Sequence, residues 1–152
     1  MSLEMGIALL IGTAAIVDDL RRRAISNWIP LGALSGGLVC QVLAKGWWGL
    51  AAAGLGTAAG FGVFLVFYLL GGMGGGDIKL MAGFGALLGA SRLVQAALWT
   101  AIAGALLAVV VIGLSWIRRR GSTRPRTATP ATIPYAPAIA VGVWMALIPT
   151  GG

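Results

Sequence analysis

Four acidic residues are the candidates for chemistry in this chain of 152 residues: Glu4, Asp18, Asp19 and Asp77. The sequence has no histidine and one cysteine, which excludes Ser-His-Asp and Cys-His hydrolases, histidine-ligated metalloproteases and zinc sites built from several cysteines. Any hydrolytic chemistry must therefore use carboxylates. Two carboxylates that converge can share one proton, so that one activates water as a base while the other acts as an acid.

The elements that would position these acids are transmembrane helices. Apolar residues make up 59% of the chain, charged residues 10%, and the mean hydropathy is +0.94, whereas soluble domains usually carry about 25% charged residues. A helix needs about 20 apolar residues to cross the bilayer. Six such spans are predicted, at Leu3–Val17, Trp28–Ala44, Trp47–Leu70, Ile78–Ser91, Leu93–Ile117 and Ile133–Thr150. We therefore predict an all-α polytopic membrane protein, one bundle of about six transmembrane helices, with a single domain over residues 1–152.

Close packing of these helices is predicted from glycine. Glycine occupies 25 positions, and three pairs have the small-xxx-small spacing that lets helix backbones approach closely in lipid. The pairs are Gly32 with Gly36, Gly56 with Gly60, and Gly85 with Gly89.

Basic residues predict the orientation. Nine of the eleven lie in or beside three alternate connections, at residues 18–27, 71–77 and 118–132, so the positive-inside rule places these connections in the cytoplasm and both termini outside. We expect the basic residues of these connections to contact the anionic headgroups of membrane lipids. Nucleic acid binding is not predicted, because no stacking surface or recognition helix accompanies the charge. The connection at residues 118–132 is rich in Arg, Thr and Pro and is predicted to be a flexible cytoplasmic loop.

Three of the acids, Asp18, Asp19 and Asp77, fall at the predicted cytoplasmic edge, although about sixty residues separate them in sequence. Ionisable groups at membrane depth are usually functional or paired. Two structural interpretations stay open: Asp18 and Asp19 could form interfacial ion pairs with the following arginines, and Asp77 could cap a helix. The glycine-rich residues 71–76 favour a cleft, because they lack side chains that would obstruct an extended peptide.

Two motifs resemble those of the type IV prepilin peptidases, which are GxGD membrane aspartyl proteases. Residues 74–80, Gly-Gly-Gly-Asp-Ile-Lys-Leu, match the form GxGDxKL, and Asp19 is followed by the family's aliphatic residue at Ile25 and its Asn at Asn27. The stretch Ile133–Ile139, with Gly142, is similar to the family's last helix. The three segments occur in the family's order and span nearly the whole chain.

The resemblance implies a prokaryotic inner-membrane endopeptidase that removes the short basic leader of prepilins at the cytoplasmic face, with Asp19 and Asp77 as the catalytic pair. The short chain resembles the peptidase-only form found with Flp-like pili. Gly74, Gly76, Lys79 and Asn27 are the expected substrate-binding or supporting residues. Ser26 departs from the family pattern, which commonly has Pro there, so the turn after the first span is expected to be less rigid.

No cofactor and no metal are expected, and the prepilin is the expected partner. N-methyltransferase activity is in doubt, because the chain has neither the cysteine-paired segment of longer members nor a Gly-rich cofactor loop. The alternative function is a non-catalytic membrane transporter or pilus-assembly scaffold subunit. A transport path should place polar groups near the midplane, often between repeated halves, whereas these acids lie at one face. The sequence does not identify the prepilin or the oligomeric state.

Overall fold

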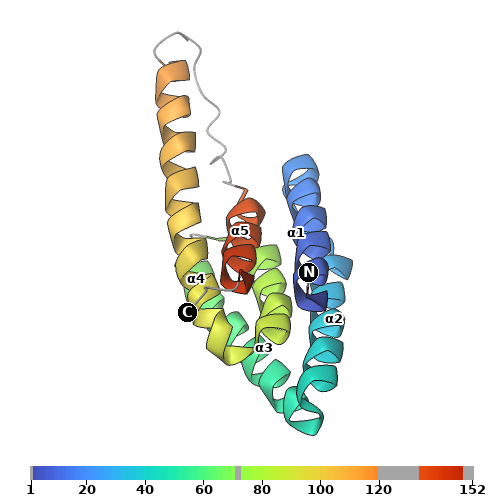
Figure 1. Ribbon diagram of the computed structural model, residues 1–152. Helices are drawn as coiled ribbons and strands as arrows, with labels where there is room; N and C mark the ends of the chain where they lie inside the picture. The colour runs from blue at the N-terminus through green and yellow to red at the C-terminus, as the bar shows by residue number, and fades with distance from the viewer. Residues whose placement is uncertain (1, 71–72, 120–133, 149–152) are drawn as a thin grey trace.

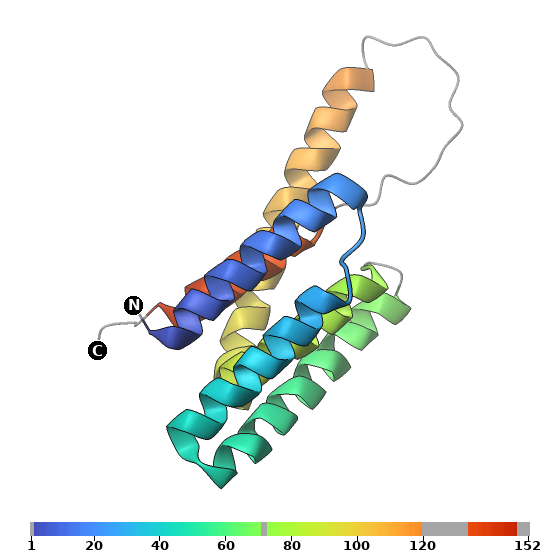
Figure 2. The ribbon, with the colours of Figure 1, turned by 90° about the vertical axis from the view of Figure 1, so that its right-hand side faces the viewer.

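The computed structural model describes residues 2–70, 73–119 and 134–148. These residues form five helices and no strand, which confirms an all-α protein: α1 (Leu3–Arg22), α2 (Trp28–Lys45), α3 (Trp47–Leu69), α4 (Gly75–Arg119) and α5 (Ala136–Leu147) (Figure 1). The longest helix, α4, packs against all four others. Its C-terminal part extends past the rest of the bundle (Figures 1 and 2). The predicted loop at residues 118–132 lies outside the described residues from residue 120 onward.

The first helix is longer than the predicted span Leu3–Val17. The Ser2 hydroxyl caps its start by accepting a hydrogen bond from the Met5 N–H, and Arg21 and Arg22 lie in its last turn, where cations are favoured. The chain leaves the helix at Arg23, which has a φ of 52° and donates its N–H to the Asp19 carbonyl. The helix therefore continues through the polar residues after the apolar run and carries Asp18 and Asp19 in its last turns.

The count of six helices is not confirmed. The fourth and fifth predicted spans belong together to α4, in which Gly89 alone has non-helical angles, with φ 66° and ψ 169°. A positive φ is accessible to glycine at little cost, and the two arms of α4, residues 75–88 and 90–119, diverge from this point (Figure 1). The buried Gln41 side chain donates a hydrogen bond of 3.1 Å to the Leu87 carbonyl just before the kink, satisfying an acceptor in the interrupted turn.

Glycine lets the first arm of α4 lie deep in the bundle. Gly56 of α3 and Gly85 of α4 face each other so closely that a Cβ on either would overlap the other's carbonyl oxygen. A Cβ on Gly37 of α2 would overlap the backbone of α4 at Leu87, and one on Gly83 would lie 2.6 Å from the Pro30 carbonyl oxygen. The first arm is thus held between α2 and α3 by direct backbone contact, as small residues allow in membranes.

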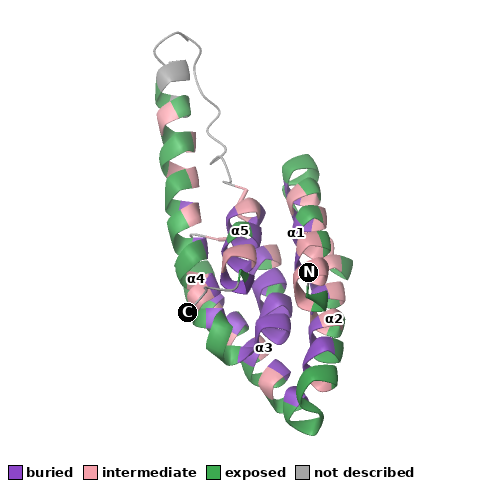
Figure 3. Cartoon of the chain, in the orientation of Figure 1, coloured by how far each residue is buried: buried purple, intermediate pink, exposed green. Residues whose placement is uncertain are grey.

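The outer surface of the bundle is apolar. Three of the described helices are long and apolar enough to cross a membrane, namely α2, α3 and residues 75–114 of α4, and α5 is a shorter apolar helix. Buried residues concentrate on the first arm of α4 and on α5, whereas the second arm is largely exposed (Figure 3). Large exposed side chains such as Leu98, Val109 and Leu55 point outward. These features define an all-α membrane protein whose exterior suits lipid.

Candidate active site

Two aspartates are buried where α1 ends and where α4 and α5 begin. Asp19 lies in the last turn of α1 and Asp77 in the first turn of α4, and each is only 7% exposed. Buried acids need hydrogen-bond partners or charge partners. We call this part of the molecule the dyad end of the bundle.

The carboxylate of Asp19 is held by the start of α5. Its Oδ2 accepts a hydrogen bond of 3.1 Å from the backbone N–H of Ala136, the first residue of that helix. Because anions are favoured at helix N-termini, α5 contributes a fixed positive dipole here. Asp19 lies beyond the predicted apolar span, and burial raises the pKa of its carboxyl, while the Ala136 N–H and the charge of Arg23 act in the opposite direction.

The carboxylate of Asp77 closes the first turn of its own helix. Its Oδ2 accepts a hydrogen bond of 3.2 Å from the Gly74 N–H, and its own N–H donates to the Gly74 carbonyl at 3.2 Å. This is the return half of a capping box, with the acid at the third helical position. The prediction that Asp77 might be an N-cap is therefore wrong in position, although the side chain does serve the helix start.

The two aspartates lie at the same end of the bundle, where Gly76 beside Asp77 contacts Ile25 of the connection that follows Asp19. Two carboxylates that lie close together disfavour simultaneous ionisation, and a pair of this kind can share one proton. Such a pair can accept a proton from water on one side and donate one on the other.

Asp18 has a different environment from its neighbour. Its Oδ2 accepts a hydrogen bond of 2.8 Å from the Ser26 N–H, and its Oδ1 lies 3.4 Å from Nε of Arg22. Hydrogen bonds from the side chain and backbone of Ser26 hold the pKa of Asp18 below its usual range. Asp18 therefore holds the connection after α1 and forms the ion pair with a following arginine that was one of the two structural interpretations of the sequence.

Ile25 joins the two predicted motifs. A Cβ added to Gly76 would lie 3.1 Å from Cβ of Ile25, so the connection after α1 rests directly on the start of α4. Ile25 also packs against the buried core. The absence of a side chain at Gly76 therefore favours close approach of the segments that carry Asp19 and Asp77.

Lys79 and Asn27 form a second link between these segments. Nζ of Lys79 donates a hydrogen bond of 3.1 Å to Oδ1 of Asn27, and both residues are exposed. Both were expected to be substrate-binding or supporting residues, and the structure joins them to each other. Asn27 stands at the N-cap position of α2, but its side chain makes no capping hydrogen bond there.

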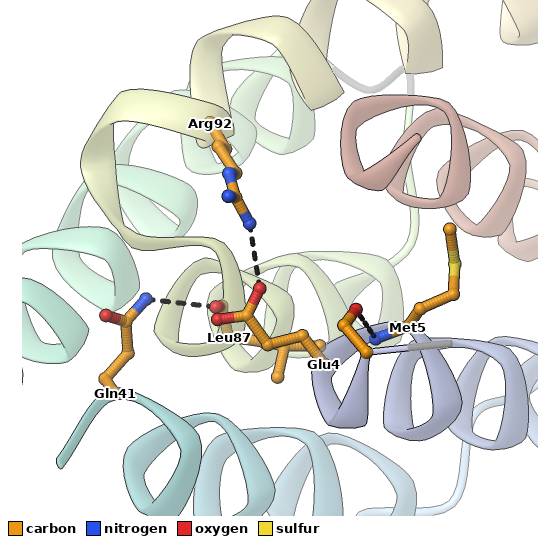
Figure 4. A network of polar contacts seen from close by, with 6 residues as sticks. Glu4, Met5, Gln41, Leu87 and Arg92 are labelled. Carbon is orange, nitrogen blue, oxygen red and sulfur yellow. Dashed lines mark hydrogen bonds and ion pairs between the residues drawn. The ribbon is translucent and has the colours of Figure 1, made fainter. Parts of the chain in front are cut away.

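The fourth acid lies at the opposite end of the bundle. Glu4 Oε2 accepts a hydrogen bond of 2.8 Å from Nη1 of Arg92, just past the kink in α4, and the Gln41 to Leu87 hydrogen bond lies nearby (Figure 4). This pair ties the start of α1 to the second arm of α4. Glu4 is thereby separated from the dyad end. Among the described residues, no group of three or more acids or cysteines could hold a metal ion.

Sequence reasoning missed the backbone donor at Ala136. A main-chain N–H is present at every residue except proline, so residue type carries no signal for it. The only signal was positional, because Ala136 lies within the stretch that is similar to the last helix of the prepilin peptidases.

The fold and the site define an all-α membrane protein with two buried carboxylates at one end of its helical bundle, and comparison with known proteins identifies the family. The type IV leader peptidase family model matches residues 6–109, which include both aspartates. The chain belongs to this family. It is similar to the prepilin leader peptidase/N-methyltransferase of Aeromonas hydrophila, with 33% identity over 137 residues, 86% of this chain and 43% of the relative.

A second relative has a similar name. The prepilin leader peptidase/N-methyltransferase of Bacillus subtilis (strain 168) is 39% identical over 96 residues, 62% of this chain and 35% of the relative. The chain thus spans less than half the length of these curated relatives. No solved structure matches it.

Proposed function

We propose that the chain is a membrane aspartyl endopeptidase that cleaves the short basic leader from type IV, Flp-like prepilins at the cytoplasmic face of the inner membrane. The observation that carries the proposal is the pair of buried carboxylates of Asp19 and Asp77 at one end of the bundle, each held by a backbone N–H. Family membership supports the substrate class.

The proposed reaction follows from the shared proton. The ionised member of the pair takes a proton from water as the oxygen attacks the scissile carbonyl carbon, and the protonated member donates its proton to the carbonyl oxygen. Collapse of the tetrahedral intermediate breaks the C–N bond, and a proton goes to the leaving nitrogen. The products are a leader with a new carboxylate and a mature chain with a new amino terminus.

The test is processing of a prepilin by four single variants at matched membrane abundance. Asp19→Asn and Asp77→Asn should each lower the cleavage rate by about 100-fold or more, because an amide cannot exchange the proton and general acid–base catalysis contributes about 10²–10⁴. Asp18→Asn and Glu4→Gln are the matched controls and should keep most activity, since both acids lie outside the pair.

Three results would contradict the proposal. Substantial cleavage by Asp77→Asn would exclude the shared-proton mechanism. Loss on Asp18→Asn with retention on Asp19→Asn would mean that the wrong member of the adjacent pair has been chosen. Failure of the unaltered chain to process any prepilin would favour the alternative of a non-catalytic transporter or assembly scaffold.

A further inference from the structure

An apolar groove runs between α3 and the second arm of α4 and reaches the dyad end. It has a volume of about 520 Å³ and is lined from α3 and α4 by apolar side chains that include Ala59, Val63, Phe67, Val94, Leu98 and Ala101. No charged residue lines it. Side chains such as Val63, at 45% exposed, and Leu98, at 63%, form an open lateral rim. The groove therefore opens sideways from the bundle, toward the lipid.

One end of the groove lies beside the residues that hold the two aspartates. Met73 and Tyr135 also line it. Each immediately precedes a backbone N–H donor of the site: Gly74 follows Met73 and donates to Asp77, and Ala136 follows Tyr135 and donates to Asp19. An occupant at this end of the groove would thus lie one residue away from the groups that hold both carboxylates.

The length and width of the groove match a single helix. Residues 90–105 of α4 line the groove and, at about 1.5 Å per residue, extend for roughly 22 Å. A helix is about 10 Å across, so the groove accommodates one face of an apolar helix that stays partly in lipid. Because Met73 and Tyr135 line one end of the groove, a helix bound there would bring the residues at its own end toward the backbone donors of the site.

We propose that the groove between α3 and the second arm of α4 binds the apolar helical segment that immediately follows the scissile bond of the substrate, and that Met73 and Tyr135 mark where this segment gives way to the peptide being cleaved. The inference rests on the proposed function. Tyr135 has a further role in it: its ring lies against Gly104, where an added Cβ would come within 2.9 Å of it. The position of the second arm is thereby linked to the Ala136 N–H that holds Asp19.

A matched pair of variants tests the groove. Ala101→Leu fills it from an exposed position on α4, and Ala51→Leu adds the same atoms at an exposed position of α3 that does not line it. Two substrates are compared: a prepilin with its apolar helix, and a peptide with the same leader and cleavage site followed by a polar sequence. Ala101→Leu should raise KM for the prepilin at least tenfold and leave kcat/KM for the polar peptide within twofold, whereas Ala51→Leu should match the unaltered chain on both.

The outcomes separate this inference from the proposed function. If Ala101→Leu cleaves the prepilin as well as the unaltered chain does, the groove inference is overturned and the peptidase proposal stands. If Ala101→Leu slows both substrates equally, the substitution has disturbed the aspartates and the groove inference is also overturned. If the unaltered chain cleaves neither substrate, the proposed function fails.

Photo-crosslinking identifies the occupant directly. A benzoylphenylalanine at position 101 of the Asp77→Asn variant should crosslink to the apolar segment of a bound prepilin, and the same group at position 51 should not. Crosslinks from position 101 to a second copy of the chain, or to lipid alone in the presence of prepilin, would overturn the assignment.

Discussion

The contact between Gly56 and Gly85 makes Gly85→Ala an informative substitution. A Cβ at residue 85 would overlap the Gly56 carbonyl oxygen and would lie 2.7 Å from the Gly56 carbonyl carbon and 3.2 Å from the Thr57 nitrogen. Carbon atoms pack best at about 3.5–4.0 Å, so α3 and α4 must separate by roughly 1 Å or more. The atoms in the way belong to the backbone, so rotation of a side chain cannot relieve the overlap.

The expected loss of stability follows from two opposing effects. Overpacking of this kind costs about 1–3 kcal/mol, with the upper end appropriate for rigid backbone, while replacing glycine by alanine inside a helix contributes about 1 kcal/mol in the other direction. The net loss is about 2 kcal/mol. Since 1 kcal/mol changes Tm by about 2–4 °C in domains of 150 to 250 residues, Tm should fall by about 4–8 °C.

Thermal unfolding in one detergent, followed by the fluorescence of the six tryptophans, measures the effect. Gly54→Ala on α3 is the control, because an added Cβ there meets nothing within 4 Å. Gly54→Ala should only improve the helix propensity of α3, so its Tm should be unchanged or higher by a few degrees. A Gly85→Ala protein as stable as the Gly54→Ala protein would refute the close crossing of α3 and α4.

Three other predictions concern topology, pH and metal. An alkaline phosphatase fusion should be active at residue 46 and inactive at residue 125, and the reverse pattern would overturn the predicted orientation. Because Ser26 holds the pKa of Asp18 below its usual value of about 3.9, the stabilising contribution of Asp18 is complete above that value and is lost as the pH falls through the lowered pKa. Between about pH 5 and pH 2, the Tm of the Asp18→Asn protein should therefore fall less than the Tm of the unaltered chain. An equal fall in Tm for the two proteins would contradict this prediction. Chelators should leave prepilin processing unchanged, and inhibition reversed by adding back one metal would exclude a mechanism with carboxylates alone.

The helices could be predicted from composition because apolar runs of the right length have few alternatives in a bilayer. Their ends were less predictable. Hydropathy falls after Val17, but backbone hydrogen bonding continues to Arg22, because polar residues with good helix propensity can extend a helix into the interface. The predicted fourth and fifth spans were separated at Arg92, whereas the chain turns at Gly89 and resumes helical geometry directly after it.

The placement of Asp19 and Asp77 on the same face was predictable, because two predicted spans lie between the connections that carry them and an even number of spans returns the chain to the same side of the membrane. The supporting contacts were not. Lys79 lies two residues after Asp77, but residues at that spacing on a helix do not face each other, and its side chain reaches Asn27 instead. The contact of Gly76 with Ile25 depends on how two distant segments pack, which residue spacing alone does not determine.

The helix geometry explains why two adjacent acids differ in chemistry. Consecutive residues point in directions about 100° apart on a helix, so Asp18 faces Arg22 and the Ser26 N–H while Asp19 faces the buried start of α5. A bidentate arginine beside Asp19 would favour its ionised form strongly, whereas a backbone N–H is a neutral donor that leaves protonation accessible. The contacts of Asp18 thus belong to the turn after α1, whereas the proposed proton sharing belongs to Asp19 and Asp77.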